Sequence, residues 1–217
     1  KFAGIDVFDL EINEKDPKKL IQIIRSLEPT FGGINLEDIK APECFEIEQT
    51  LKQEMNIPVM HDDQHGTAII SGAALMNALE LVQKNIEDIK LVVSGAGAAA
   101  ISCLRFYVSL GVKKENIIVC DKDGVIRKDR QGLLDIHLEF ATDKNITTIA
   151  EALPGADVFL GLSAGNIISQ EMIKSMAPDP IVFALANPDP EIGYDDAIAA
   201  RKDVIMATGR SDHPNQV

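Results

Sequence analysis

The chain has 217 residues, 46% of them hydrophobic and 25% charged, so it can form one large or two smaller globular domains and lacks the composition of a disordered or fibrous protein. Its formal net charge of −13 argues against nucleic acids and anionic membranes as partners, because the average field of the protein would repel both. No apolar run approaches the ~20 residues that a membrane span needs.

Short β-branched segments alternate along the chain with segments whose apolar residues recur at helical spacing, which predicts βαβ units and a mostly parallel sheet. The predicted strands are residues 4–12, 31–38, 57–62, 90–95, 116–121, 157–162, 181–187 and 204–209. The predicted helices are residues 17–27, 44–55, 67–83, 98–110, 146–152, 169–176 and 194–200. This order of elements places the chain in the α/β class.

The residues at the two ends of the chain indicate whether the polypeptide is a fragment. The first residues, KFAGIDVF, contain no initiator Met and no signal segment, and the last, ATGRSDHPNQV, are typical of the middle of a loop. We therefore expect a polypeptide that is truncated at both ends.

Cys44, Cys103 and Cys120 lie far apart and form no CxxC pair, which indicates reduced, buried cysteines in a cytoplasmic protein.

Residues 95–100, GAGAAA, lie between a predicted strand and a predicted helix and follow the pattern G-x-G-x-x-A. Gly95 permits a tight turn, Gly97 lets a pyrophosphate approach the backbone, and Ala100 lets the helix pack closely on the strand. The helix N-terminus adds amide donors and the positive end of a dipole. A packing turn without a ligand is the alternative, but the strand–turn–helix context favours dinucleotide binding.

This turn predicts a Rossmann-type, doubly wound parallel sheet that forms a NAD(P)-binding domain over residues 67–217. Only three predicted strands precede it, too few for a well-covered parallel sheet. We therefore interpret residues 1–66 as the C-terminal part of a second, catalytic α/β domain and place the boundary near Gly66.

Asp121 ends the predicted strand 116–121, where such folds place a carboxylate that accepts hydrogen bonds from the adenosine ribose. A carboxylate there disfavours a 2′-phosphate, so NAD is favoured over NADP. Lys122 follows directly and could neutralise that phosphate, so NADP stays open. Taken alone, Asp121 is more typical of a turn residue at a strand end.

Two acidic pairs end neighbouring predicted strands: Glu37 with Asp38, and Asp62 with Asp63. Parallel strands end at the same edge of a sheet, so carboxylates from both could bind one hard divalent cation, Mg²⁺ or Mn²⁺. The alternative is that each pair caps a helix or lies in a solvated turn. The nearby histidines, at positions 61 and 65, are interpreted as structural donors, since the short spacing and the excess of carboxylates do not favour zinc.

The segments GGINLEDIKAPECFEIE and IPVMHDDQHGTAIISGAALMNAL are similar to those of malic enzymes of the bacterial and archaeal type. The motifs GAGAAA, DKDGVI, GLSAGN and LANPDPEI follow in that family's order, so the resemblance extends over nearly the whole chain. It implies oxidative decarboxylation of L-malate to pyruvate and CO₂, reduction of NAD(P)⁺, and a requirement for a divalent cation. It also implies a homodimer or a larger homo-oligomer.

The resemblance also implies residue roles. Glu37, Asp38 and Asp63 would bind the metal, Asp62 would position the lysine base, and Asn187 would contact malate and the nicotinamide side of the cofactor.

Three further positions would border the cofactor: Ser163 and Ala164 in the loop after a later strand, and Thr67 beside a helix start. Ordinary loop or cap chemistry is the alternative for these three.

Two catalytic groups of that family, a tyrosine acid and a lysine base, would lie before the first residue of this chain. Tyr107 and Tyr194 are interpreted as packing residues and Lys1 as no base, so none of them replaces these groups. A second substrate-binding asparagine would fall just beyond Val217. We therefore expect the chain alone to bind cofactor, and metal weakly, with little or no malate turnover.

Two other functions stay open at this point. A non-catalytic NAD-sensing module would need Gly95 and Asp121 but not the acidic pairs. A metal-independent dehydrogenase, such as a relative of the amino-acid or methylenetetrahydrofolate dehydrogenases, could share the fold. A requirement for a divalent cation would separate the malic enzyme from both.

Overall fold

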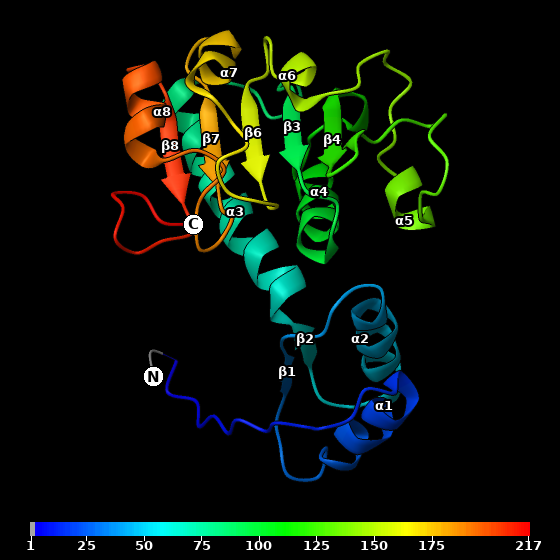
Figure 1. The fold of residues 1–217 in the computed structure, drawn as a ribbon. Helices are drawn as coiled ribbons and strands as arrows, with labels where there is room; N and C mark the ends of the chain where they lie inside the picture. The colour runs from blue at the N-terminus through cyan, green and yellow to red at the C-terminus, as the bar shows by residue number, and fades with distance from the viewer. Residues whose placement is uncertain (1–2) are drawn as a thin grey trace. The chain divides into compact units, whose positions relative to one another are not determined.

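A computed structural model describes residues 3–217, and the chain divides into two compact units, Lys1–His61 and Asp62–Val217 (Figure 1). The first unit contains α1 (Pro17–Ser26), β1 (Ile34–Leu36), α2 (Glu43–Glu54) and β2 (Val59–His61). The strands β1 and β2 are parallel, with Leu36 opposite His61. An apolar core joins the helices to this pair of strands; it contains Ile21, Ile24, Leu36, Ile47, Leu51, Met55 and Val59.

The sequence-based strand at residues 4–12 is wrong, because residues 3–12 form no strand. The alternation of apolar and acidic residues predicted a half-buried strand, yet no partner strand in the described chain pairs with this segment. The side chains of Ile5, Val7 and Phe8 are 67%, 74% and 69% exposed. Phe8 still contacts the ring of Phe31, with a centroid distance of 6.1 Å. A strand pattern without a hydrogen-bonding neighbour does not make a strand.

The second unit is a six-stranded sheet in the order β5-β4-β3-β6-β7-β8, with every pairing parallel except that of β5 with β4. Its strands are β3 (Leu91–Ser94), β4 (Ile117–Asp121), β5 (Gly124–Val125), β6 (Val158–Gly161), β7 (Ile181–Ala184) and β8 (Ile205–Thr208). Its helices are α3 (Asp62–Val82), α4 (Ala98–Leu110), α5 (Asp135–Leu138), α6 (Ile149–Ala152), α7 (Gln170–Ser175) and α8 (Tyr194–Ala200), with a 3₁₀ turn, η1, at Lys114–Asn116. The chain moves outward from β3 to β4 and then returns to β6 on the other side of β3. This reversal confirms the doubly wound, Rossmann-type fold.

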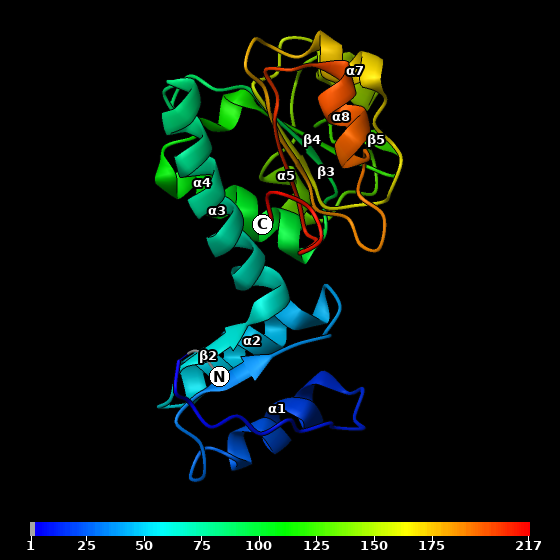
Figure 2. The same ribbon diagram turned by 90° about the vertical axis from the view of Figure 1, so that its left-hand side faces the viewer.

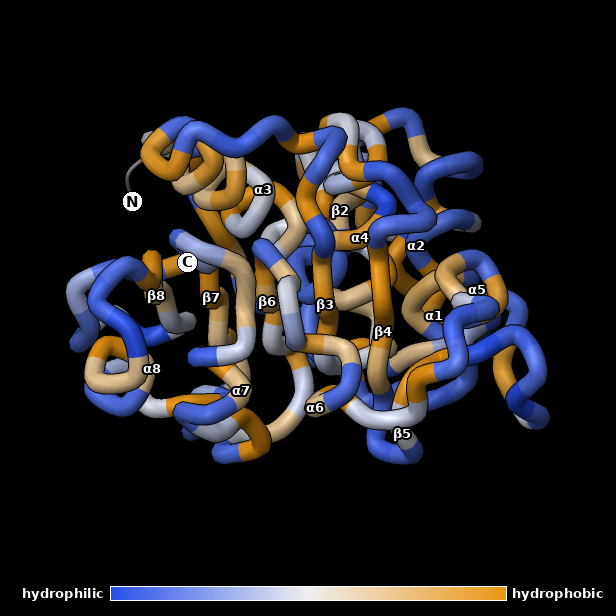
Figure 3. The backbone as a smooth tube through the Cα atoms, turned by 90° about the horizontal axis from the view of Figure 1, so that it is seen from above, coloured by the Kyte–Doolittle hydropathy of each residue, from blue (hydrophilic) through white to orange (hydrophobic). Residues whose placement is uncertain are grey.

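The sheet is covered on both faces, as a parallel sheet requires. In Figure 2, α3 and α4 lie on one side of it and α7 and α8 on the other. Alternate residues of each strand enter the two cores, so Leu91 and Val93 of β3 pack with α3 and α4, whereas Val92 packs with the opposite layer. Figure 3 shows the resulting continuous hydrophobic colour along β3, β4, β6 and β7. The strands therefore pack into an apolar core on both faces, and the loops described below follow their carboxyl ends.

Helix α3 begins at Asp62, so the sequence-based start at Thr67 is wrong and the proposed domain boundary near Gly66 lies inside this helix. Asp62 and Asp63 occupy its first turn, where the helix dipole favours carboxylates. The polar residues there interrupt the apolar spacing on which the prediction depended. Over residues 3–217, no helix has both the length and the hydropathy of a membrane span.

Gly72 sets the distance between α3 and α4, and this leads to a prediction. A Cβ added at Gly72 would lie 2.5 Å and 2.8 Å from two ring atoms of Phe106 on α4. Alanine is a better helix former than glycine, yet we expect Gly72→Ala to lower the free energy of unfolding by about 1–3 kcal/mol because of this overlap. Urea denaturation measures the change. Asn77→Ala, on the exposed side of α3, is the matched control and should not destabilise; equal midpoints for both variants would contradict the prediction.

Candidate dinucleotide-binding site

The glycine turn has the geometry of a phosphate-binding loop. Gly95 has φ +113°, and a Cβ there would lie 2.5 Å from the carbonyl oxygen of Leu162, so only glycine fits. Gly97 is the N-cap of α4; no side chain caps the helix, and a Cβ at Gly97 would meet nothing within 4 Å. Ala100 is buried in the core on which α4 packs. The first turn of α4 therefore has no side-chain cap for its amides, and the space beside Gly97 is open.

Asp121 lies at the expected place, at the end of β4, but its carboxylate is already hydrogen-bonded. Arg130 donates to both oxygens, Nη1 to Oδ1 at 2.9 Å and Nη2 to Oδ2 at 2.5 Å, and the backbone N–H of Asp123 donates to Oδ1 at 2.8 Å. Burial opposes ionisation of Asp121, but these bonds outweigh it and hold its pKa below the ordinary value. The sequence reading missed Arg130, and an arginine nine positions after an acidic strand end is the signal that could have indicated it.

The loops after β6 and β7 are joined by one buried carboxylate, that of Glu191. Its Oε1 accepts from the backbone N–H of Ser163 at 2.9 Å, and its Oε2 accepts from that of Ala186 at 3.1 Å. Glu191 is fully buried, and this burial raises its pKa although the two backbone bonds oppose the shift. The carboxylate lies directly over Gly161, where no side chain would fit. Glu191 was not among the residues predicted from the sequence.

These two loops contain three of the expected contact residues, and all three are exposed: Ser163, Ala164 and Asn187. The hydroxyl of Ser163 lies 2.7 Å from that of Ser94 at the end of β3, which brings the β6 loop beside the glycine turn. Thr67 is half-buried inside α3 and does not stand at a helix start as expected.

The acidic residues expected to bind metal follow two paired strands. Leu36 of β1 is opposite His61 of β2, and the next residues in sequence are Glu37 and Asp62. Asn35 donates from its side-chain amide to Glu37 at 2.8 Å, and Asp38 has φ +57°, which non-glycine residues rarely adopt. Among residues 3–217, no group of three or more His, Cys, Asp or Glu side chains is arranged to hold a metal ion.

Asp62 has a specific setting within the first turn of α3. A Cβ on Gly66 would overlap its carboxylate, so the absence of a side chain at Gly66 leaves the space that Asp62 occupies. The roles of Asp62 as a positioning residue and of Glu37, Asp38 and Asp63 as ligands stay predictions.

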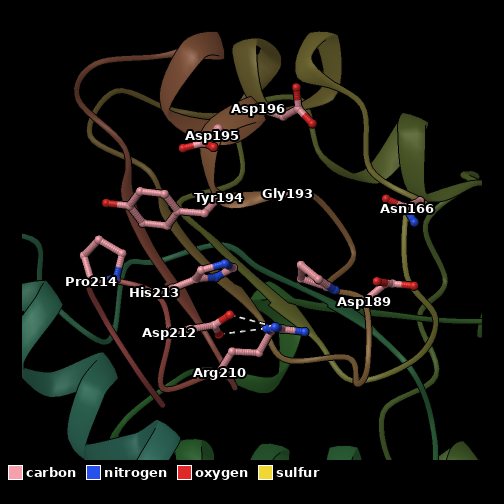
Figure 4. Close-up of a pocket in the computed structure, with 11 residues that line it drawn as sticks. Asn166, Asp189, Gly193, Tyr194, Asp195, Asp196, Arg210, Asp212, His213 and Pro214 are labelled. Carbon is pink, nitrogen blue, oxygen red and sulfur yellow. Dashed lines mark hydrogen bonds and ion pairs between the residues drawn. The ribbon is translucent and has the colours of Figure 1, made fainter.

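A cavity of about 600 Å³ lies beyond the ends of β7 and β8 and was not predicted (Figure 4). Arg210 forms a two-bond ion pair with Asp212, through Nε at 2.8 Å and Nη2 at 2.7 Å, and this pair lowers the pKa of Asp212 to about 2. His213 is held by the hydroxyl of Thr208 at 2.9 Å and lies against the ring of Tyr194. Asp189 lies on the opposite wall, in the loop that contains Asn187.

Comparison with known proteins identifies the family. Residues 64–216 match the family described as "Malic enzyme, NAD binding domain", and residues 7–52 match "Malic enzyme, N-terminal domain". The chain belongs to the malic enzyme family. The resemblance inferred from the motifs is thereby confirmed.

Individual malic enzymes are similar in sequence to this chain over its whole length. The NADP-dependent malic enzyme of Haemophilus influenzae is 61% identical over all of this chain, and the NAD-dependent malic enzyme of Rhizobium meliloti is 54% identical. The crystal structure of the NAD-dependent malic enzyme of Thermotoga maritima superimposes with a TM-score of 0.93 at 48% identity, covering 100% of this chain and 58% of that one. The chain spans 29% of the Haemophilus relative and 28% of the Rhizobium relative.

The two glycines of the turn give a paired prediction. Gly95→Ala should lower the free energy of unfolding by about 1–3 kcal/mol, because it strains a positive φ and forces a Cβ against the Leu162 carbonyl. Gly97→Ala should leave stability almost unchanged, since its φ of −78° and its surroundings accept a methyl group. It should nevertheless weaken dinucleotide binding, because the methyl group occupies the approach of the pyrophosphate. Chemical denaturation and calorimetric titration measure the two effects; tight binding by Gly97→Ala would contradict the second.

Glu191 gives a prediction about pH. Its pKa in the folded protein is raised above the ordinary value of 4.5, so its ionisation favours the unfolded chain. Neutral Glu191 therefore contributes its full stabilisation of the folded protein below pH 4.5. This contribution decreases as the pH rises through the pKa of Glu191 in the folded protein. Glu191→Gln cannot ionise but loses one of the two acceptors, at a cost of about 1–3 kcal/mol. The stability gap between wild type and Glu191→Gln should therefore narrow from pH 4.5 to pH 8 in denaturation curves; a gap that widens would refute the assignment.

Proposed function

We propose that this chain provides the dinucleotide-binding and part of the metal-binding machinery of a malic enzyme, which oxidatively decarboxylates L-malate to pyruvate and CO₂ and reduces NAD(P)⁺. The observation that supports this most strongly is the open, uncapped start of α4 beside Gly97, in a region that matches the family's NAD-binding domain. The named relatives use either NADP or NAD, so both cofactors belong to the proposal at this stage.

The proposed cofactor contacts follow from the turn and the loops. The α4 amides and Gly97 would bind the pyrophosphate, as helix N-termini do for anions. Four residues would border the adenosine and nicotinamide halves of the cofactor: Asp121, Ser163, Ala164 and Thr67. Asn187, exposed after β7, would orient the nicotinamide side and malate together, which fixes the geometry for hydride transfer.

The proposed metal ligands are Glu37, Asp38 and Asp63. Their carboxylate oxygens are the hard ligands that Mg²⁺ and Mn²⁺ prefer, and all three residues follow closely after the end of β1 or β2 in the sequence. When bound, the cation supplies a Lewis acid that polarises the oxygen on C2 of the substrate. Asp62, seated over Gly66, would hold the lysine base in place. Three buried, free cysteines support a cytoplasmic location, and homo-oligomeric assembly completes the proposal.

Mn²⁺ binding tests the metal assignment without any measurement of activity. We expect Asp63→Asn to weaken calorimetric Mn²⁺ binding by about tenfold or more, because an amide oxygen replaces an anionic ligand of a hard cation. Asp88→Asn is the matched control, since Asp88 is an exposed aspartate near the start of β3, and it should leave Mn²⁺ affinity unchanged. Denaturation curves of both variants verify that they fold. Equal Mn²⁺ affinities of wild type and Asp63→Asn would remove Asp63 from the ligand set.

Cofactor titration tests the wider proposal. NAD⁺ or NADP⁺ should bind the wild-type chain, and Mn²⁺ should tighten that binding only while Asp63 is intact. Binding that is indifferent to Mn²⁺ would favour a metal-independent dehydrogenase or an NAD-sensing domain instead.

A further inference from the structure

The carboxylate of Glu191 lies beside the place where the sheet reverses its direction of winding. The chain leaves β3 toward β4 and returns to β6, so the loops after β3 and β6 flank the switch point, where doubly wound sheets bind their ligands. A Cβ at Gly161, the last residue of β6, would overlap this carboxylate. Glu191 is therefore packed against the strand end from which the second of these loops begins.

Glu191 holds the loops after β6 and β7 at the same level of the sheet. The last residues of these strands, Gly161 and Ala184, are opposite each other. The two backbone N–H groups that donate to the carboxylate belong to Ser163 and Ala186, each two residues beyond its strand. Backbone N–H groups in irregular segments have no strand partner, so one buried side chain provides the acceptors that these two loops need.

The β6 loop is also attached to the glycine turn. The backbone N–H of Leu162 donates to the carbonyl of Ser94 at 2.7 Å, and the carbonyl of Leu162 packs against Gly95. The hydroxyls of Ser94 and Ser163 are 2.7 Å apart. Continuous contacts therefore join the glycine turn, the β6 loop, the carboxylate of Glu191 and the β7 loop.

The hydrogen bonds of Glu191, rather than its volume, account for a carboxylate at this position. Burial of a carboxylate is unfavourable unless its oxygens are hydrogen-bonded, and an apolar side chain would fill the same space without this cost. Glutamine has one acceptor oxygen and would turn its NH₂ group toward the other backbone N–H. Only glutamate satisfies both loops at once.

We propose, on the basis of the proposed dinucleotide function, that Glu191 is the positioning residue for the nicotinamide side of the site. It holds Ser163 and Asn187 at the spacing with which they contact the nicotinamide half of the cofactor. The glycine turn serves the pyrophosphate and the end of β4 serves the adenosine half. The carboxylate bonds of Glu191 go to the other two loops, so its effect should be confined to ligands that reach those loops.

Calorimetric titration tests this by comparing each dinucleotide with its adenosine fragment: NAD⁺ with 5′-ADP, and NADP⁺ with 2′,5′-ADP. Glu191→Gln should weaken binding of the dinucleotide about tenfold, because one loop loses its acceptor, and should change the affinity for the fragment little. Bound NADH or NADPH gives a spectroscopic readout, since the chain contains no Trp whose emission would interfere. The change in nicotinamide fluorescence on binding should be smaller in Glu191→Gln than in wild type.

Glu151→Gln is the matched control. Glu151 is an exposed glutamate whose Oε2 also accepts from two backbone N–H groups, those of Thr147 and Thr148 at the start of α6. The control variant loses a comparable pair of bonds away from the candidate site. It should therefore leave the ratio of dinucleotide affinity to fragment affinity unchanged. Denaturation curves verify that both variants fold.

Hydrogen exchange of the wild-type protein provides a test that does not depend on the folding of Glu191→Gln. The dinucleotide should slow amide exchange in the loops after β6 and β7, and the adenosine fragment should not. Equal protection by both ligands would overturn the role of Glu191, as would an unchanged affinity ratio or an equal loss of both affinities in Glu191→Gln. Failure of the wild type to bind either dinucleotide would instead refute the proposed function.

Discussion

The close approach of backbone segments at the carboxyl edge of the sheet is the constraint on which the candidate site depends. Three positions without side chains permit it. Gly95 allows β3 to turn against the carbonyl of Leu162, and Gly161 makes room for the carboxylate of Glu191. Gly165 in turn lies against the backbone of Asp189, where a Cβ would be 2.7 Å from the nearest atom. Each approach brings together loops that are distant in the sequence, so the candidate site depends on close backbone packing as well as on its side chains.

The buried side chain of Glu191 also joins two of these loops. A buried carboxylate with two backbone N–H donors fixes the β6 and β7 loops relative to each other, as a side chain does when it replaces missing backbone hydrogen bonds. Burying this carboxylate removes it from water, and this desolvation raises the pKa of Glu191. The exposed residues Ser163 and Asn187 therefore lie on loops that the Glu191 carboxylate ties together.

Most regular elements of the second unit could be predicted from the sequence, but α5, β5 and the start of α3 were not, and neither were the contacts at the edge of its sheet. Helices α4 and α8 have the predicted bounds, because periodic apolar residues reach their ends. The strand at residues 4–12 was wrong because a local pattern contains no information about its partner. The glycine turn was predictable from spacing. Arg130 and Glu191 were not, because their roles arise from pairing with residues nine and twenty-eight positions away, through segments with no regular pattern.

The overall negative charge of the protein makes local contacts important for binding an anionic dinucleotide. A protein with a formal net charge of −13 repels an anionic dinucleotide at long range, and screening limits that repulsion to about 8–10 Å at physiological salt. Affinity must therefore come from groups that act within this distance. The amides of α4 can hold the pyrophosphate that both cofactors share, so they cannot distinguish them. At the end of β4, the local charge within this distance is the balance between the paired side chains of Asp121 and Arg130.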